Sequence, residues 1–198
     1  DHNGRYAFNQ QPYIGLWNLS CLAQALLPLA EKEPLKAVLE SYQPLFDREY
    51  LRLMRSKLGL QEERTEDDGL IRDLLGLLQE SHTDYTILFR ELGSFSSATG
   101  AANDTLREHF VNRERFDDWA VRYRDRLHSE DSRDAERRER MNRVNPKYVL
   151  RNYLAQAAIE KAQQKDFSEI DRLFRLLQNP YSDQPDMDAY AAPPPNWG

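Results

Sequence analysis

The sequence predicts an all-helical protein, and three observations support this fold class. The chain of 198 residues contains 27 Leu but only 10 Val and Ile together, and Leu favours helices whereas β-branched residues favour strands. It contains only 8 Gly, so few tight hairpin turns are expected. Apolar residues also recur at helical spacing along most of the chain.

The first predicted helix begins near Pro12, which suits a first helical turn, and runs to about Leu27. Residues 1–12 before it are irregular. Apolar side chains, including Trp17, cover nearly the whole surface of this helix, so we expect it to be central and buried. On the same grounds Cys21 is expected to be a small packing residue.

Proline, glycine and capping residues predict the next boundaries. Pro34 opens a second helix, Pro44 predicts a kink or break, and Gly59 is a plausible helix end. Thr65, with Asp68 three residues later, marks a third helix start because its hydroxyl can accept from free first-turn amides.

The middle of the chain is divided by a loop at residues 93–103. Before this loop, Asp84 is expected to cap a short helix. After it, a helix presents one large apolar face made by Phe116, Trp119, Tyr123 and Leu127. A charged helix then begins at Asp131 or Ser132 and ends near Val144.

The last third contains two more predicted helices and a tail. Asn145–Pro146 breaks the chain, because the residue before proline avoids helical angles. A helix from Tyr148 to Gln164 should make contacts through Val149, Tyr153, Ala157 and Ile159. Asp166 and Glu169 form a capping-box-like start for the last helix, which carries Ile170, Leu173, Phe174 and Leu177. Residues 179–198 form an extended Pro-rich tail, which Tyr190 and Trp197 are expected to hold against the body.

Charge argues against two classes of partner. The net charge is −6 and the pI is about 5.3, which disfavours nucleic acid and anionic lipid. Residues 113–143 hold ten Arg but also nine Asp or Glu, so we interpret them as a solvated, ion-paired face. The uncharged run 6–30 is too polar to span a membrane, and no signal peptide is visible.

No self-contained site is predicted from the residues. The chain has no Gly-rich phosphate loop, its four His are far apart in sequence, and its single cysteine excludes an intrachain disulfide and a thiolate zinc cluster. We therefore assign no catalytic, cofactor-binding or metal-binding residue to this chain.

A series of short motifs runs in order along the whole chain. They are Gly4-Arg5-Tyr6-Ala7-Phe8, Gln11-Pro12, Leu16-Trp17-Asn18-Leu19, Met54-Arg55, Lys57-Leu58-Gly59, Asp84-Tyr85-Thr86, Phe89-Arg90, Phe116-Asp117-Asp118-Trp119, Asn145-Pro146, Leu150-Arg151-Asn152-Tyr153, Asn179-Pro180-Tyr181-Ser182-Asp183 and Pro194-Pro195-Asn196-Trp197-Gly198. This ordered set resembles the selenoprotein O family, called YdiU in bacteria.

The resemblance implies a protein-kinase-like fold, of which this chain is the C-terminal part of the helical lobe. It implies a pseudokinase-type adenylyltransferase that moves AMP from ATP to Ser, Thr or Tyr hydroxyls with Mg or Mn. The family's catalytic and ATP-binding residues lie upstream, so this chain is expected to scaffold the site, to bind no cofactor alone and to be inactive alone. The expected partners are the upstream part of the same protein and protein substrates, in the bacterial cytoplasm.

Within this resemblance, residues 1–12 correspond to an activation-segment-like loop, residues 13–178 to the helical lobe and residues 179–198 to the tail. Arg5, Tyr6 and Gln11 could help shape the substrate surface, or they could simply anchor the loop to the first helix. Two alternatives for the whole protein stay open: a non-enzymatic helical interaction module, and a true kinase that transfers the γ-phosphate. If this chain is a helical lobe separated from the rest of its protein, it should expose a large apolar patch within residues 6–29.

Overall fold

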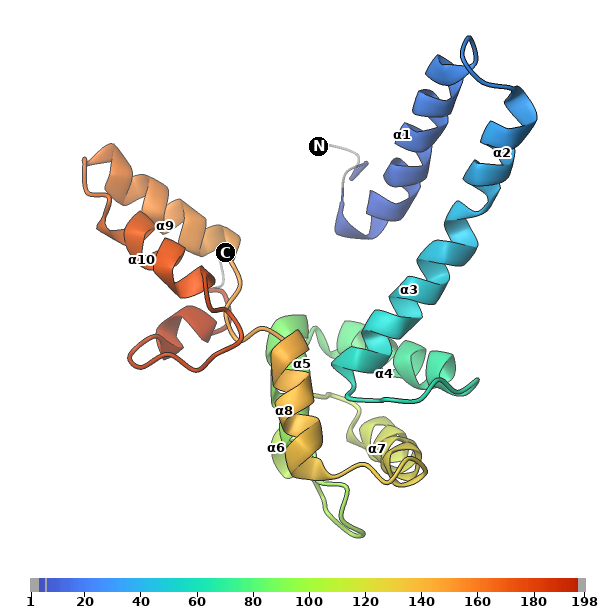
Figure 1. Ribbon diagram of the computed structural model, residues 1–198. Helices are drawn as coiled ribbons and strands as arrows, with labels where there is room; N and C mark the ends of the chain where they lie inside the picture. Colours follow the sequence, from blue (N-terminus) through green and yellow to red (C-terminus); the bar gives the residue numbers. More distant parts are fainter. Residues whose placement is uncertain (1–3, 6, 196–198) are drawn as a thin grey trace. The chain divides into compact units, whose positions relative to one another are not determined.

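The computed structural model describes residues 4–5 and 7–195, and every regular element in these ranges is a helix (Figure 1). The predicted all-helical class is therefore confirmed. The chain divides into two compact units, residues 1–53 (unit 1) and 54–198 (unit 2). The division falls inside a helix and not in the loop at 93–103. Among the described residues, no helix has both the length and the apolarity needed to cross a membrane.

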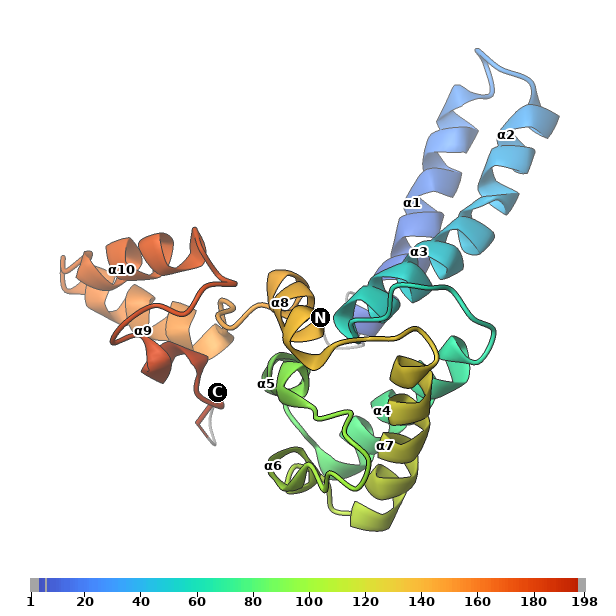
Figure 2. The ribbon, with the colours of Figure 1, turned by 60° about the horizontal axis from the view of Figure 1, so that its bottom comes forward.

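Unit 1 is a helical hairpin. Its elements are η1 (Phe8–Gln10), α1 (Gln11–Leu26), α2 (Lys32–Glu40) and the first part of α3 (Tyr42–Lys57). Figures 1 and 2 both show α1 running beside α2. The predicted break before Pro44 is confirmed, because α2 ends at Glu40 and α3 begins at Tyr42.

Gly15 allows α1 to approach the start of α3 closely. The Tyr42 hydroxyl donates a hydrogen bond to the Pro12 carbonyl at 3.0 Å. A Cβ at position 15 would lie only 2.9 Å from that hydroxyl oxygen. The hairpin therefore closes at a point where the chain carries no side chain.

The prediction that α1 is central and buried is wrong for this chain. No described residue of unit 1 is buried, Trp17 is 52% exposed, and Cys21 is exposed instead of packed. The physical reason is that apolar residues surround α1, whereas the hairpin covers only part of its circumference. Apolar side chains of α1 such as Tyr13 and Leu22 are accordingly exposed, at 68% and 55%, and the large contiguous patch stays a prediction.

Unit 2 begins at the end of α3, where Gly59 acts as predicted. Gly59 has a φ of 72°, and the Leu60 amide reaches back to the Arg55 carbonyl at 2.9 Å, as in a glycine-terminated helix. The next helix, α4 (Asp67–Ser81), begins two residues after Thr65, and Thr65 does not cap it. Instead the Asp67 carboxylate accepts from the Arg64 amide at 3.0 Å, which organises the turn before the helix.

The main core of unit 2 is aromatic and surrounds α7. Its helices are α4, α5 (Tyr85–Glu91), η2 (Leu92–Ser94), α6 (Asp104–Arg107), α7 (Arg113–His128) and α8 (Asp134–Val144). The predicted face of α7 is confirmed: Phe116, Trp119, Tyr123 and Leu127 all have 0% exposure. The Trp119 and Tyr123 rings stack at 4.8 Å. Their polar atoms are satisfied by backbone carbonyls, Trp119 Nε1 by Leu70 at 2.9 Å and the Tyr123 hydroxyl by Leu58 at 2.6 Å.

The Arg-rich stretch is only partly the solvated face that the sequence indicates. Arg126 and Arg137 are buried, because each has a carboxylate or carbonyl partner inside the fold. The Arg137 guanidinium donates to the Phe95 carbonyl and to Asp134. Sequence charge balance alone does not show which cations have such partners.

The boundaries after α7 differ from the prediction by a few residues. The helix α8 begins at Asp134, because Asp131 has a φ of 51° and cannot continue a helix. The break at Asn145–Pro146 is confirmed, but the next helix, α9 (Asn152–Gln163), begins at Asn152 and not at Tyr148. The amides of Lys147 and Tyr148 bond instead to the Pro180 carbonyl, at 2.8 and 3.1 Å.

A small second core joins α9 to α10 (Ser168–Leu177), which lie side by side in Figures 1 and 2. It contains Leu154, Ala158 and Leu173, with Tyr153 and Tyr190 packed against it. The predicted contact Ile159 is instead exposed. Residues after 179 include η3 (Asp188–Ala191). The predicted packing of Tyr190 is confirmed, whereas Trp197 lies outside the described residues.

The capping box predicted at Asp166 and Glu169 does not form. The Asp166 carboxylate accepts from the Ser168 amide at 3.0 Å. Glu169 does not return to the helix start, because its carboxylate binds Lys161 at 2.8 Å and the Tyr190 hydroxyl at 2.5 Å. Glu169 therefore connects α9, α10 and the tail.

Candidate functional site

The three residues predicted for a substrate surface lie at the start of unit 1. The Arg5 guanidinium carbon lies 4.9 Å from the centre of the Trp17 ring, within the range of a cation–π contact. Gln11 is the first residue of α1, and Tyr6 lies outside the described residues. The Arg5 contact is what an anchoring role requires, and a role at the substrate surface stays a prediction.

Unit 1 also holds an apolar groove. Its volume is about 290 Å³, and it lies between α1, α2 and the start of α3. Its lining includes Leu19, Leu22, Leu35 and Val38, of which Leu22 and Val38 are more than half exposed. Such a surface is chemically suited to packing against another apolar surface and not to acid–base chemistry.

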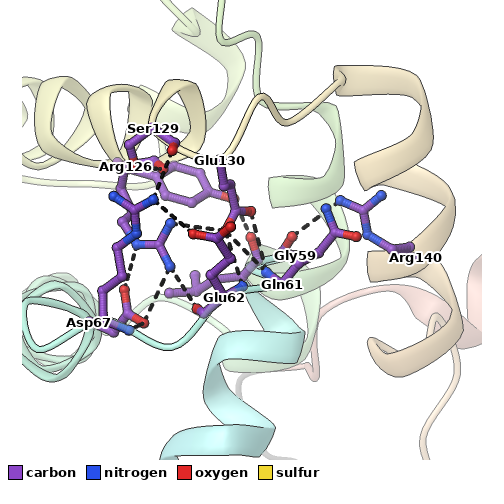
Figure 3. A network of polar contacts seen from close by, with 11 residues as sticks. Gly59, Gln61, Glu62, Asp67, Arg126, Ser129, Glu130 and Arg140 are labelled. Atoms are coloured by element: carbon purple, nitrogen blue, oxygen red, sulfur yellow. Dashed lines mark hydrogen bonds and ion pairs between the residues drawn. The ribbon is translucent and has the colours of Figure 1, made fainter.

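A network of buried charges in unit 2 lies at the junction of α3, α4 and α7 (Figure 3). The Arg126 Nε donates to Asp67 at 2.7 Å, and both side chains are at most 3% exposed. A second nitrogen of Arg126 donates to Glu130 at 2.9 Å, and a third donates to the Glu62 carbonyl at 2.7 Å. Arg126 thus joins two helices to the loop between α3 and α4.

Glu130 completes this junction from the end of α7. Its carboxylate accepts from the Gln61 amide at 3.2 Å and from the Glu62 amide at 3.3 Å (Figure 3). Burial by itself lowers the pKa of Arg126, but the hydrogen bonds that Arg126 donates to Asp67 and Glu130 outweigh it and raise the pKa above the usual value. The cation is therefore permanent, and the network is suited to fixing the loop and not to moving protons.

A cavity of about 540 Å³ opens beside the network and is lined by both charge types, including Arg64, Arg122 and Asp125. Arg64 already donates to Glu62 and to the Ser129 carbonyl, both at 2.8 Å. Arg122 already donates to Asp73 at 2.7 Å. Because its cations are paired, the cavity offers little net attraction to an anion.

The motifs that carry the family resemblance meet one another in unit 2. Lys57 Nζ donates to the Asn145 side chain at 3.1 Å, and the Asn145 amide returns a bond to the Lys57 carbonyl at 2.8 Å. Arg151 donates twice to Asp84, at 2.6 and 3.1 Å. These residues come from four separate motifs in the sequence, so the motifs hold distant segments together.

Arg90, from the Phe89-Arg90 motif, connects the Asn145-Pro146 motif to the motif at residues 179–183. One of its nitrogens donates to the Asn142, Asn145 and Tyr181 carbonyls, at 3.0, 3.2 and 3.0 Å. Lys147 adds bonds to Asp183 and Asp188, at 2.9 and 2.8 Å. The residues after 178 are therefore tied by polar contacts to α5 and to the segment between α8 and α9.

Sequence reasoning missed these structural roles. Asp84 is confirmed as a cap, since it accepts from the Ile87 amide at 2.9 Å, but its bond to Arg151 could not be seen. The motif membership of Arg90 and Arg151 was the only available signal. The partners of Arg126 had no sequence signal.

Histidine and metal chemistry gain no support from the geometry. His109 Nε2 lies 2.5 Å from Glu91, and His128 Nε2 lies 2.7 Å from the Ser97 carbonyl, so each has a structural partner. Within residues 4–5 and 7–195, no three His, Cys, Asp or Glu side chains are grouped so that they could hold a metal ion.

Comparison with known proteins places this arrangement in a family. The family model described as "Protein adenylyltransferase SelO" matches residues 1–178. A curated relative from Myxococcus xanthus, "Protein nucleotidyltransferase YdiU", is 53% identical over 198 residues, which are 100% of this chain and 41% of the relative. Proteins of the same name from Herminiimonas arsenicoxydans and Vibrio vulnificus are 47% and 48% identical over the whole chain, which covers 40% and 41% of their lengths.

The chain thus spans about two fifths of the length of these relatives. The match covers both units and includes all the motifs that meet around Asn145. On this evidence the chain belongs to the SelO family of protein nucleotidyltransferases.

Proposed function

We propose that this chain is the C-terminal helical part of a protein adenylyltransferase that transfers AMP from ATP to Ser, Thr or Tyr hydroxyls of other proteins. The observation that carries the proposal is the match of the whole chain to nucleotidyltransferases whose length it covers to only about two fifths. The proposed role of this part is to scaffold a site whose catalytic and nucleotide-binding residues lie elsewhere in the protein.

The geometry of both units agrees with a scaffolding role. The buried charges around Arg126 are saturated with structural partners, and the motif residues around Asn145 bond to one another. The exposed apolar face of α1 is the kind of surface that packs against the rest of a larger fold. We propose that the upstream part of the same protein covers it.

The proposed reaction is an in-line displacement at the α-phosphate of ATP. The hydroxyl oxygen of the target forms a bond to the α-phosphorus, the bond from that phosphorus to the bridging oxygen breaks, and pyrophosphate leaves as the hydroxyl proton is lost. A divalent cation, Mg or Mn, would neutralise charge on the phosphates. We assign none of these contacts to residues of this chain. We also propose a cytoplasmic location in a bacterial cell; the organisms of the relatives support only the bacterial origin.

The test uses the full-length protein with ATP labelled at either the α- or the γ-phosphate, and this chain alone beside it. Transfer of the α-label to protein by the full-length form only is the expected result. Transfer of the γ-label instead would identify a kinase. Transfer of neither label would favour the non-enzymatic interaction module, and labelling by this chain alone would place an active site within it.

A further inference from the structure

The helix α10 is more apolar than its packing requires. Leu173 and Leu176 are buried, at 5% and 2% exposure, and Leu173 belongs to the small core shared with α9. Next to this buried face, Phe174 is 65% exposed, Ile170 44% and Phe167 58%. Three apolar side chains on or directly before this helix are therefore largely exposed among the described residues.

The exposed residues form a continuous stripe. Ile170 and Phe174 are four residues apart, so they lie above one another on one side of α10, and Phe167 is the N-cap residue directly before this helix. Leu177, one turn further on, is half-buried and continues the same line. Two phenylalanines in a row of this kind are typical of a surface that packs against protein.

The stripe lies inside the part of the chain that defines the family. The family model extends to residue 178, directly after the last residue of α10. The relatives contain this whole segment, and about 60% of their own length lies outside the part that this chain matches. The length of the relatives outside the matched part makes further polypeptide of the same protein the occupant that we consider.

We propose that the stripe of Phe167, Ile170 and Phe174 is an intramolecular docking surface, covered in the full-length protein by the portion of the polypeptide outside residues 1–198. This inference rests on the proposed function only in assuming that the chain is part of such a longer protein. The stripe would join α10 to the rest of the enzyme at a place separate in sequence from the apolar face of α1.

Cysteine labelling can test this directly. In a Cys21→Ser background, Ile170→Cys and Phe174→Cys place a thiol in the stripe, and Arg175→Cys places one on the next, exposed residue of the same helix. Any cysteine elsewhere in the full-length protein is also replaced. The alkylation rate of each thiol is measured by mass spectrometry in the 198-residue chain and in the full-length protein.

We expect the thiols at 170 and 174 to react at least about tenfold more slowly in the full-length protein, because a covered thiol reacts only when the contact opens. The thiol at 175 should react at a similar rate in both. Equal rates at 170 and 174 in both proteins would overturn the proposal and leave the stripe free for a separate partner.

Two other outcomes would also overturn it. If the thiols at 170 and 174 already react slowly in the 198-residue chain at every protein concentration, unit 1 covers the stripe. If they react more slowly as the protein concentration rises, a second copy of the chain covers it. As a second measurement, Phe174→Ser should lower the Tm of the full-length protein and leave that of the 198-residue chain unchanged. Neither readout needs AMP transfer, so the docking surface and the proposed activity can fail separately.

Discussion

Units 1 and 2 contain similar apolar residues but bury them to very different extents. In unit 2, Trp119 is completely buried and its ring nitrogen is bonded to Leu70. In unit 1, Trp17 lies on a helix that carries no charged residue and is nevertheless 52% exposed. The difference shows that apolarity predicts which surfaces need a partner, but not whether this chain contains the partner.

The largest expected effect compares these two tryptophans. Trp119→Ala should lower the free energy of unfolding of unit 2 by about 3–5 kcal/mol, because it leaves a large cavity in the aromatic core. Trp17→Ala in the same chain should cost less than about 1 kcal/mol, because half of the ring is already in water. Urea unfolding followed by far-UV circular dichroism measures both.

Similar losses for the two variants would break the comparison, since they would mean that Trp17 contributes as much as a core residue. The comparison would be sharpened by repeating Trp17→Ala in the full-length protein. If the proposed covering of α1 is correct, the cost there should rise toward that of a buried tryptophan.

The second prediction concerns two neighbouring aspartates of α4. Asp67→Ala should cost about 3–5 kcal/mol, because it leaves the buried Arg126 cation without its main partner. Asp68→Ala should cost at most about 1 kcal/mol, because the Asp68–Arg72 ion pair is exposed. The measurement is again the unfolding free energy at neutral pH, and a large loss for Asp68 would contradict this assignment.

Features with a local physical cause could be predicted from the sequence. Helix breaks at Gly59, Pro44 and Asn145 were predictable because each acts through its own backbone or the adjacent turn. The face of α7 was predictable from spacing alone. Local patterns carry such features because their physical causes lie within a few residues.

The remaining features depend on contacts between distant segments. The start of α9 was displaced because the amides before it bond to Pro180. The burial of Arg126 depends on Asp67, which is 59 residues away in sequence. The exposure of α1 was mispredicted because burial depends on what surrounds a helix as well as on its composition.

The third prediction places the same substitution in both units. Gly59→Ala should destabilise unit 2 by more than about 1 kcal/mol, because its φ is positive and a Cβ would lie 2.5 Å from Cγ of the buried Arg137. Gly15→Ala should change stability by less than about 1 kcal/mol, since the gain in helix propensity offsets the displacement of the Tyr42 hydroxyl. Thermal unfolding of both variants gives the comparison.

A loss for Gly15→Ala as large as that for Gly59→Ala would contradict this expectation. It would mean that the Tyr42–Pro12 hydrogen bond controls the closure of the unit 1 hairpin. Tyr42→Phe, which removes only the hydroxyl, separates this cause from a steric one.

The smallest expected effect is a difference in pH and salt dependence between two acids. Burial raises the pKa of Asp84, but hydrogen bonds from Arg151 and from the Ile87 amide outweigh it, so the pKa lies below the usual 3.8. In unit 1, a hydrogen bond from Arg52 lowers the pKa of the exposed Glu49 below 4.5. Both acids bind fewer protons in the folded state, so both stabilise it above the unfolded pKa and lose this effect as the pH falls through the folded pKa.

The two contributions should differ in their response to salt. The advantage of the natural protein over Asp84→Asn, measured by urea unfolding, should shrink as the pH falls below about 3.8 and should persist in about 0.5 M salt, because the pair is shielded from solvent. The advantage over Glu49→Gln should be smaller and should largely disappear in the same salt. If the stability contribution of Asp84 were as sensitive to salt as that of Glu49, the Asp84–Arg151 pair would be open to solvent. The two units would then not differ in how far they shield their ion pairs.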